Sequence, residues 1–241
     1  MSRFNNRQGF TLIELMLAMS FVSALLIAIA MTVIQIGNTY NKGLTLKEVN
    51  QAGRSLTSEL QKSIAQNKPF DINSGVGSRY IVQTWGGRLC IGQYSYIWNY
   101  GSSIAKGNKS KLNVYSNPNS DSIIRFVRVI DPNSNYCTAD IITGEYPVVS
   151  FSNAAELLSV SEHNLAVHNF IISSANSATD SKTGQQLYNI EFTIGTNDQL
   201  ALKLSGDGDT ICKAPGEKDA DSAYCSVSRF NIVALAGNSV Q

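Results

Sequence analysis

The sequence has few of the side chains that catalysis and metal binding require. Its 241 residues include only two histidines, His163 and His168, and its four cysteines lack the Cys-x-x-Cys spacing of a zinc site. It also lacks the Gly-x-Ser-x-Gly elbow, the phosphate-binding glycine loop and the metalloprotease helix motif. We therefore expect a protein that is not an enzyme and that holds no cofactor.

Net charge and proline are also scarce. The 19 Lys and Arg residues nearly balance the 18 Asp and Glu residues, so no basic surface large enough for a polyanion is predicted. The first of the five prolines is Pro69, which leaves the preceding segment free of the strongest helix breaker. The absence of repeats and of low-complexity linkers excludes a stalk or a repeat array.

The most informative feature present is a 27-residue apolar run, Phe10 to Ile36, that contains a single acid, Glu14. About 20 apolar residues cross a bilayer as a helix, so this run is long enough to span a membrane. A charge within the hydrocarbon costs about 2.5 to 3.5 kcal/mol on insertion scales. Glu14 is therefore a candidate functional residue that needs a cationic partner.

The residues before the apolar run predict its orientation. Arg3 and Arg7 lie in a segment without acids, so this flank is expected in the cytoplasm and the rest of the chain outside it. A secretory signal peptide has an apolar core of only about 7 to 15 residues, followed by small residues. Here the small residue is Gly9, which precedes the run. Cleavage after Gly9 would leave the helix on the mature chain and create a new α-amine on Phe10.

The segment Arg7-Gln8-Gly9-Phe10-Thr11-Leu12-Ile13-Glu14-Leu15 resembles the class III signal of type IV pilins and type II secretion pseudopilins. The resemblance implies that residues 1–9 are a leader, which a prepilin peptidase removes after Gly9, and that Phe10 is N-methylated. It also implies that Glu14 pairs with the α-amine of a neighbouring subunit during filament assembly. Such a pair would relieve the desolvation penalty of both charges.

The helix is predicted to continue beyond the apolar run. Residues 37–68 are polar on average, but one helical face recurs at spacings of three and four: Leu46, Val49, Gly53, Leu56, Leu60 and Ile64. We expect a continuous helix from Phe10 to about Gln66, ~85 Å long at 1.5 Å per residue, with local bends at its glycines. The segment from Glu48 to Leu60 also resembles minor pilins of the W type and minor pseudopilins of the J type.

Residues 69–241 have the pattern of an antiparallel β-rich head. Clusters of Gly, Asn, Ser and Asp separate seven β-branched or aromatic runs: 80–82, 93–100, 123–130, 148–151, 165–172, 187–194 and 230–235. A brief helix from Ala154 to Leu158, capped by Asn153, is also expected. The predicted fold class is α+β: the second half of the long helix packs against an antiparallel sheet in a pilin-like roll.

All four cysteines, Cys90, Cys137, Cys212 and Cys225, lie in the predicted extracytoplasmic head, where disulfides are favoured over metal thiolates. Four cysteines allow three pairings. We favour Cys212 with Cys225, because a short hydrophilic loop near the C-terminus is otherwise flexible, and Cys90 with Cys137 by default. Closing the shorter loop is expected to contribute about 3 kcal/mol.

Two neighbouring features of the head are candidate ligand surfaces. Four alternating aromatic residues would share one strand face: Tyr94, Tyr96, Trp98 and Tyr100. Such a row most often packs in a core, and otherwise it forms a platform for glycans or nucleobases. The basic cluster of Lys106, Lys109 and Lys111 is either a solvated hairpin loop or a contact for DNA phosphates.

The loop between Ser205 and Tyr224 contains five carboxylates, of which Asp207 and Asp209 are weak candidates for calcium ligands. The spacing lacks the glycine and the closing glutamate of an EF-hand, and Asp-Gly turns account for the repeat without a metal. We therefore predict no metal site and keep this pair as a calcium alternative.

Together these patterns predict a structural subunit, most like a minor pilin, which inserts in the inner membrane through residues 10–36 and then joins a type IV pilus. Its expected partners are other pilin subunits, the prepilin peptidase, an inner-membrane assembly platform and membrane lipid. The close alternative is a minor pseudopilin of a type II secretion or competence machine, in an extracellular or periplasmic filament. Two other classes remain: a filament-displayed adhesin or DNA-binding head, and a membrane-anchored domain that never polymerises. An exposed aromatic row would favour the adhesin or DNA-binding class.

Overall fold

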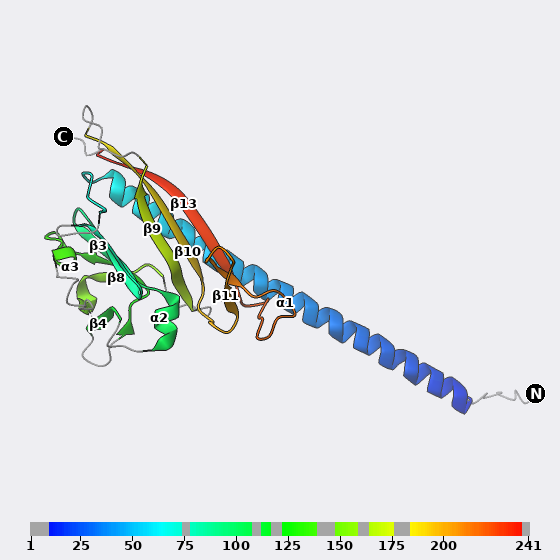
Figure 1. Cartoon of the computed structure of the whole chain (residues 1–241). Helices are drawn as coiled ribbons and strands as arrows, with labels where there is room; N and C mark the ends of the chain where they lie inside the picture. Colours follow the sequence, from blue (N-terminus) through cyan, green and yellow to red (C-terminus); the bar gives the residue numbers. More distant parts are fainter. Residues whose placement is uncertain are drawn as a thin grey trace, which may run out of the picture. The chain divides into compact units, whose positions relative to one another are not determined.

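The computed structural model describes residues 10–73, 78–107, 112–116, 122–138, 148–158, 164–175 and 184–237. Its backbone contacts divide the chain into two compact units, 1–41 and 42–241. Helix α1, Leu12–Ala65, contributes to both units, and the strands belong to the second (Figure 1).

Helix α1 confirms the predicted long helix and begins and ends within two residues of the expected positions. It continues without interruption through Gly37, Gly43 and Gly53, since no proline breaks it. Its buried residues are spaced as one helical face: Thr45, Val49, Gly53, Leu56, Leu60, Ser63 and Ile64. Leu46, which we expected on this face, is 44% exposed. Thr45 takes its place, one residue and about 100° away around the helix.

Two antiparallel sheets form most of the second unit. The larger has the order β1-β2-β3-β6-β8 and the smaller the order β13-β10-β9. The strands of the larger sheet are β1 (Tyr80–Gln83), β2 (Gly86–Ile91), β3 (Tyr94–Asn99), β6 (Phe126–Ile130) and β8 (Ala154–Glu156). Those of the smaller are β9 (Leu165–Ser174), β10 (Gln186–Thr196) and β13 (Val227–Ala236). This bears out the predicted α+β class.

Shorter elements complete the described part of the unit. They are β4 (Val114–Ser116), β5 (Ser122–Ile123), β7 (Val148–Ser150), β11 (Leu202–Leu204), β12 (Thr210–Cys212), α2 (Gly101–Lys106), α3 (Asn135–Thr138) and the 3-10 helix η3 (Phe151–Asn153). β11 pairs with β12 and β4 pairs with β5, both antiparallel. β4 also pairs with β7 in parallel, which an antiparallel reading of the sequence does not anticipate.

The prediction of a helix from Ala154 to Leu158 is wrong, because the first three of these residues form strand β8 and the last two are not helical. β8 pairs with β6, and the carboxylate of Glu156 accepts the backbone N–H of Phe126 at 2.7 Å and the hydroxyl of Tyr115 at 2.9 Å. Burial raises the pKa of Glu156, and these hydrogen bonds oppose that shift. The tertiary contacts of one carboxylate thus override the local helix propensity.

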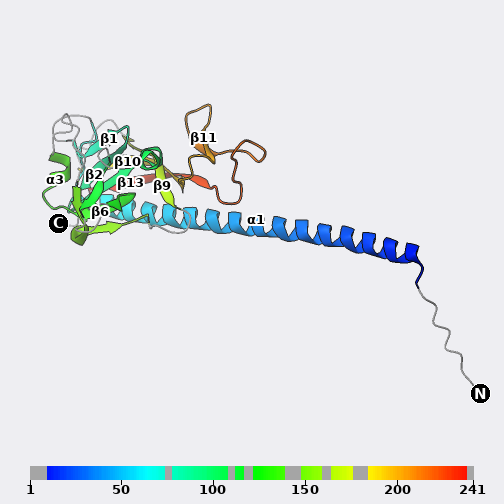
Figure 2. The same cartoon turned by 90° about the horizontal axis from the view of Figure 1, so that it is seen from below.

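The main core lies where α1 packs against the inner faces of both large sheets. Buried side chains of α1 such as Leu56 and Leu60 share one cluster with Trp98 of β3 and Phe170 of β9. Figure 1 shows β9, β10 and β13 side by side along the cyan end of α1, and Figure 2 shows the same arrangement from below. A line of rings crosses this core, with centroid separations of 4.5 Å for Trp98–Phe170 and 6.0 Å for Phe170–Phe192.

A partly buried polar cluster also joins α1 to the larger sheet. Arg128 Nη1 of β6 lies 2.7 Å from Glu59 Oε1 of α1, and the Tyr96 hydroxyl donates to the same oxygen at 3.0 Å. The Arg128 guanidinium also stacks 4.9 Å from the centroid of the Tyr94 ring. The hydrogen bond to Glu59 raises the pKa of Arg128, which keeps the guanidinium charged.

Candidate functional site

The start of α1 is closed by reciprocal hydrogen bonds between Thr11 and Glu14. The backbone N–H and the hydroxyl of Thr11 donate to Glu14 Oε2 at 2.9 and 2.8 Å. The backbone N–H of Glu14 donates in return to Thr11 Oγ1 at 3.3 Å. This arrangement is a capping box, in which an N-cap threonine and the glutamate three residues later satisfy each other's backbone amides. The Thr-x-x-Glu spacing indicates this cap in the sequence, and it is a second role for Glu14 beside the expected pairing with a neighbouring subunit.

The capping box occupies only part of the Glu14 carboxylate. Oε2 has two donors, whereas Oε1 accepts no hydrogen bond from the residues that the structure describes. The charge also remains, so a nearby cation would still lower the free energy of this group in an apolar environment. Phe10, the expected new N-terminus, is described and 88% exposed, while Gly9 lies outside the described residues.

The first half of α1 exposes an apolar surface. Every residue from Phe10 to Tyr40 is exposed. In the described part of the chain, α1 is the one helix that is long and apolar enough to cross a membrane. The hydroxyls that interrupt this surface donate to carbonyls of their own helix, as Ser23 does to Met19 at 2.8 Å and Thr32 to Ala28 at 2.8 Å. An apolar surface of this size requires a covering of lipid or of other apolar helices.

Both favoured cysteine pairs are disulfide-bonded in the structure. Cys90 and Cys137 join β2 to α3, and Cys212 and Cys225 close a loop between β12 and β13. The shorter loop is further fixed to α1, because the Thr45 hydroxyl donates to the carbonyl of Ala223 at 3.5 Å. The disulfides thus attach segments with few core residues of their own.

The aromatic row is not a ligand platform. Tyr96 and Trp98 are fully buried in the main core, and the partly buried Tyr94 and Tyr100 pack against it. Tyr96 is held by its hydrogen bond to Glu59. The other side of β3 is buried too, since Ile97 belongs to a second core cluster, so neither face of this strand is free for a glycan or a base.

The basic cluster beside this strand is only partly described. Lys106 is exposed at the end of α2, and Lys109 and Lys111 lie outside the described residues. With the aromatic row buried, Lys106 has no exposed stacking partner from β3. The combination that would have favoured nucleic-acid binding is therefore not formed by the described residues.

The acidic loop does not converge on a metal site. Asp209 Oδ2 accepts a hydrogen bond from Arg229 Nη1 at 2.9 Å, and Glu217 Oε1 lies 2.6 Å from Lys203 Nζ. Asp207 is exposed in the turn between β11 and β12. Among the described residues no three His, Cys, Asp or Glu side chains are placed to hold a metal ion. Ion pairing and turn geometry account for these carboxylates.

One histidine is described and is a packing residue. His168 Nε2 lies 3.1 Å from the carbonyl oxygen of Thr196, and the ring packs beside Gly101. Burial lowers the pKa of His168 to about 4, so the ring is neutral at physiological pH. His163 lies outside the described residues.

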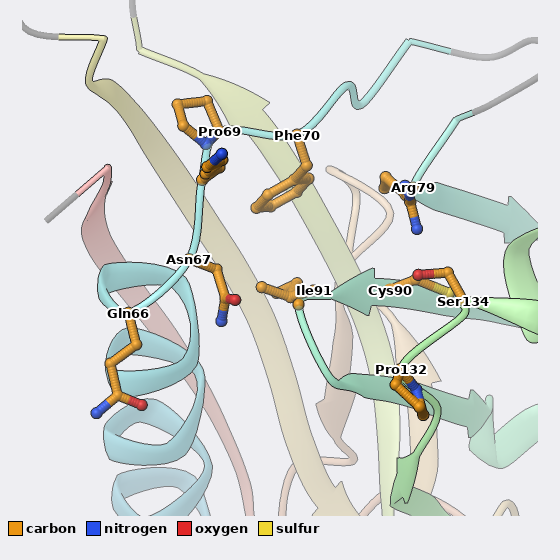
Figure 3. Close-up of a pocket in the computed structure, with 11 residues that line it drawn as sticks. Gln66, Asn67, Pro69, Phe70, Arg79, Cys90, Ile91, Pro132 and Ser134 are labelled. Atoms are coloured by element: carbon orange, nitrogen blue, oxygen red, sulfur yellow. The ribbon is translucent and has the colours of Figure 1, made fainter. Parts of the chain in front are cut away.

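A pocket that the sequence pattern did not indicate lies at the C-terminal end of α1 (Figure 3). Its volume is about 420 Å³. Its walls come from the segment after α1, from the residue before β1, from the end of β2 and from the turn between β6 and α3: Gln66, Asn67, Lys68, Pro69, Phe70, Arg79, Cys90, Ile91, Gly92, Pro132 and Ser134. These segments are distant in sequence, so no local motif reveals the site.

Comparison of the chain with protein-family models, with curated proteins and with solved structures finds no match. The fold and the start of α1 are therefore the observations on which a function can be argued. They define an α+β protein with a long apolar N-terminal helix and a disulfide-bonded β-sheet head, which is compatible with a pilin-like architecture.

Proposed function

We propose that this protein is a structural subunit of a type IV pilus, a minor pilin that assembles through its N-terminal apolar helix. The observation that carries the proposal is the presence of one acid, Glu14, in an apolar segment whose residues are all exposed, Phe10 to Tyr40. A membrane anchor needs only the apolar residues. The acid adds a cost of about 2.5 to 3.5 kcal/mol on insertion scales, which a function must offset.

In the proposed pathway the chain first inserts in the inner membrane, with residues 1–9 in the cytoplasm. A prepilin peptidase then cuts after Gly9 and methylates the new terminal amine of Phe10. The carboxylate of Glu14 keeps its capping bonds to Thr11 and pairs with the α-amine of a neighbouring subunit. The apolar helices then cover one another in the filament core, which replaces the covering that lipid gave.

The close alternative is a minor pseudopilin of a type II secretion or competence machine, because the same helix and head serve both kinds of filament. The alternative of a DNA-binding or adhesin head loses its main support, because Tyr96 and Trp98 of the aromatic row are buried. In a lone membrane anchor that never polymerises, Glu14 would cap its own helix but its charge would have no cationic partner.

The test is to replace Glu14 with Ala and to measure how much of the protein is recovered in sheared surface filaments of cells that express the filament machinery. We expect at least a tenfold loss, while insertion in the membrane is unchanged or improved. Ser23→Ala is the matched control in the same span, because the Ser23 hydroxyl bonds only to its own helix among the described residues. Normal assembly of Glu14→Ala, or a mature chain that mass spectrometry shows to begin at Met1, would overturn the proposal.

A further inference from the structure

The pocket at the C-terminal end of α1 has the size of a small-ligand site. Ligand pockets are typically about 300 to 1000 Å³, and this one measures about 420 Å³. Figure 3 shows Asn67 and Phe70 on the segment after the helix, with Ile91 facing them and Arg79 on the far side of Phe70. The site lies wholly within the second unit.

The walls of this pocket are held in place by contacts outside it. The Phe70 ring stacks on Tyr188 with centroids 4.4 Å apart, and the Phe70 N–H donates to the Tyr188 hydroxyl oxygen at 2.8 Å. Asn67 Nδ2 donates to the carbonyl of Ser63 at 2.7 Å, and Cys90 is fixed by its disulfide. Preformed walls of this kind lower the ordering cost of binding.

The charged side chains that line the pocket are both basic. Lys68 and Arg79 are exposed, and neither side chain has an ion pair or hydrogen bond with a residue that the structure describes. No Asp or Glu is among the described lining residues. A guanidinium can bind both oxygens of a carboxylate, and a neighbouring ammonium adds a second charge-assisted contact. The pocket therefore favours an anionic ligand.

The remaining walls indicate which kind of anion fits. The C-terminal end of α1 carries partial negative charge, which penalises a doubly charged phosphate more than a singly charged carboxylate. Phe70 and Pro132 offer apolar surface, and the amide of Asn67 points into the space, where it can meet a ligand hydroxyl (Figure 3). A carboxylate, hydroxyls and an apolar ring face occur together in acidic sugars.

We propose that this pocket binds a carboxylated sugar residue of the uronic-acid class, free or at the end of a glycan. Lys68 and Arg79 hold its carboxylate, and Phe70 packs against its ring. The site is complete within the head, so it adds a binding role to the proposed filament subunit without depending on filament assembly.

The test is a ligand-observed NMR titration of the purified full chain in detergent micelles, with glucuronate as the probe and glucose as the neutral counterpart. We expect glucuronate to bind and glucose to bind at least tenfold more weakly. The double variant Lys68→Gln/Arg79→Gln should lose at least tenfold in affinity for glucuronate. Lys106→Gln, which removes an exposed cation outside the pocket, should stay within twofold of the unmodified protein. Peptide mapping of both disulfides and circular dichroism check that the variants are folded.

Several outcomes would overturn the assignment. If glucuronate does not bind, or if the double variant still binds it, the pocket is not a site for this ligand. Equal binding of inorganic phosphate would show a simple anion site without sugar recognition. Binding of a short oligodeoxynucleotide that the double variant abolishes would assign the pocket to nucleic acid. A parallel loss in Lys106→Gln would show only nonspecific attraction to the charge of the head.

Discussion

At the residue scale, the start of α1 depends on one hydroxyl. The Thr11 hydroxyl both donates to Glu14 and accepts from its backbone N–H, so it fixes the carboxylate as well as the helix end. A valine at this position keeps the shape but removes both bonds, and loss of an N-cap costs about 1 kcal/mol. The proposed counter-ion is then presented by a less ordered first turn.

We predict that Thr11→Val speeds amide exchange in the first turn of α1 by roughly fivefold, as loss of about 1 kcal/mol of capping implies. Thr11→Ser keeps the hydroxyl and should remain within about twofold of the unmodified protein. Amide exchange rates of both variants and of the unmodified protein are measured by NMR on the full chain in micelles. Identical rates in all three proteins would show that the hydrogen bonds do not stabilise the helix end.

His168 makes stability depend on pH. Its pKa is about 4 in the folded protein because of burial, against about 6.5 in an unfolded chain. Between these values the unfolded chain binds the proton and the folded protein does not, so stability falls as the pH falls through this window. We expect His168 to lower the free energy of unfolding by about 2 kcal/mol between pH 7 and pH 5.

The contribution of His168 is isolated by comparison with His168→Gln, whose amide can still donate to the Thr196 carbonyl but cannot titrate. Urea unfolding at both pH values should show a smaller loss of stability in this variant than in the unmodified protein. The same loss in both proteins would assign the pH dependence to other groups.

At the element scale, α1 approaches β13 through Gly53. A Cβ at this position would overlap the Phe230 ring, whereas a Cβ at Gly43 on the same helix would meet open space. Alanine improves helix propensity by about 1 kcal/mol at either site. At Gly53 the steric cost of overpacking, about 1 to 3 kcal/mol, exceeds that gain.

We therefore expect Gly53→Ala to lower the free energy of unfolding by up to about 2 kcal/mol. The matched control Gly43→Ala should be neutral or stabilise by up to about 1 kcal/mol. Urea unfolding followed by tryptophan fluorescence measures both, and Gly53→Ala combined with Phe230→Leu should recover part of the loss. If Gly53→Ala and Gly43→Ala behave alike, the close approach of α1 and β13 does not limit stability.

The elements differ in how far the sequence predicts them, and the reason is physical. α1 is predictable because its buried face repeats every three or four residues and no proline interrupts it. Strand β2 is not predictable from the sequence, because the adjacent glycines Gly86 and Gly87 are typical of a turn. A Cβ on either glycine would overlap Trp98 of the paired strand β3, so the requirement for glycine arises only in the folded sheet.

The same contrast applies to the candidate sites. Glu14 stands out because a lone acid in an apolar run is costly anywhere, and its cap with Thr11 follows from a spacing of three residues. The pocket at the end of α1 depends on segments separated by more than sixty positions, from Gln66 to Ser134. Only the packing of the head brings them together.

At the scale of the whole molecule, the exposed apolar surface lies in the first unit and the buried core lies in the second. The residues from Phe10 to Tyr40 are all exposed and contribute nothing to the described core. The buried hydrophobic residues begin at Val49 of α1, and both disulfides lie in the second unit. The apolar residues of α1 can therefore contact lipid or other filament subunits without loss of the core that stabilises the head.

It follows that a fragment from Lys42 to Gln241 should fold without the apolar helix. We expect it to be monomeric, to form the Cys90–Cys137 and Cys212–Cys225 bonds, and to give a dispersed NMR spectrum, because it retains every core residue of the described chain. A fragment that begins at Gln61 is the matched control. It loses Val49, Leu56 and Leu60, and removal of a single such side chain already costs about 2 to 5 kcal/mol, so this control should not fold. A molten or aggregated Lys42 fragment would contradict the division into two units and show that the apolar helix supports the head.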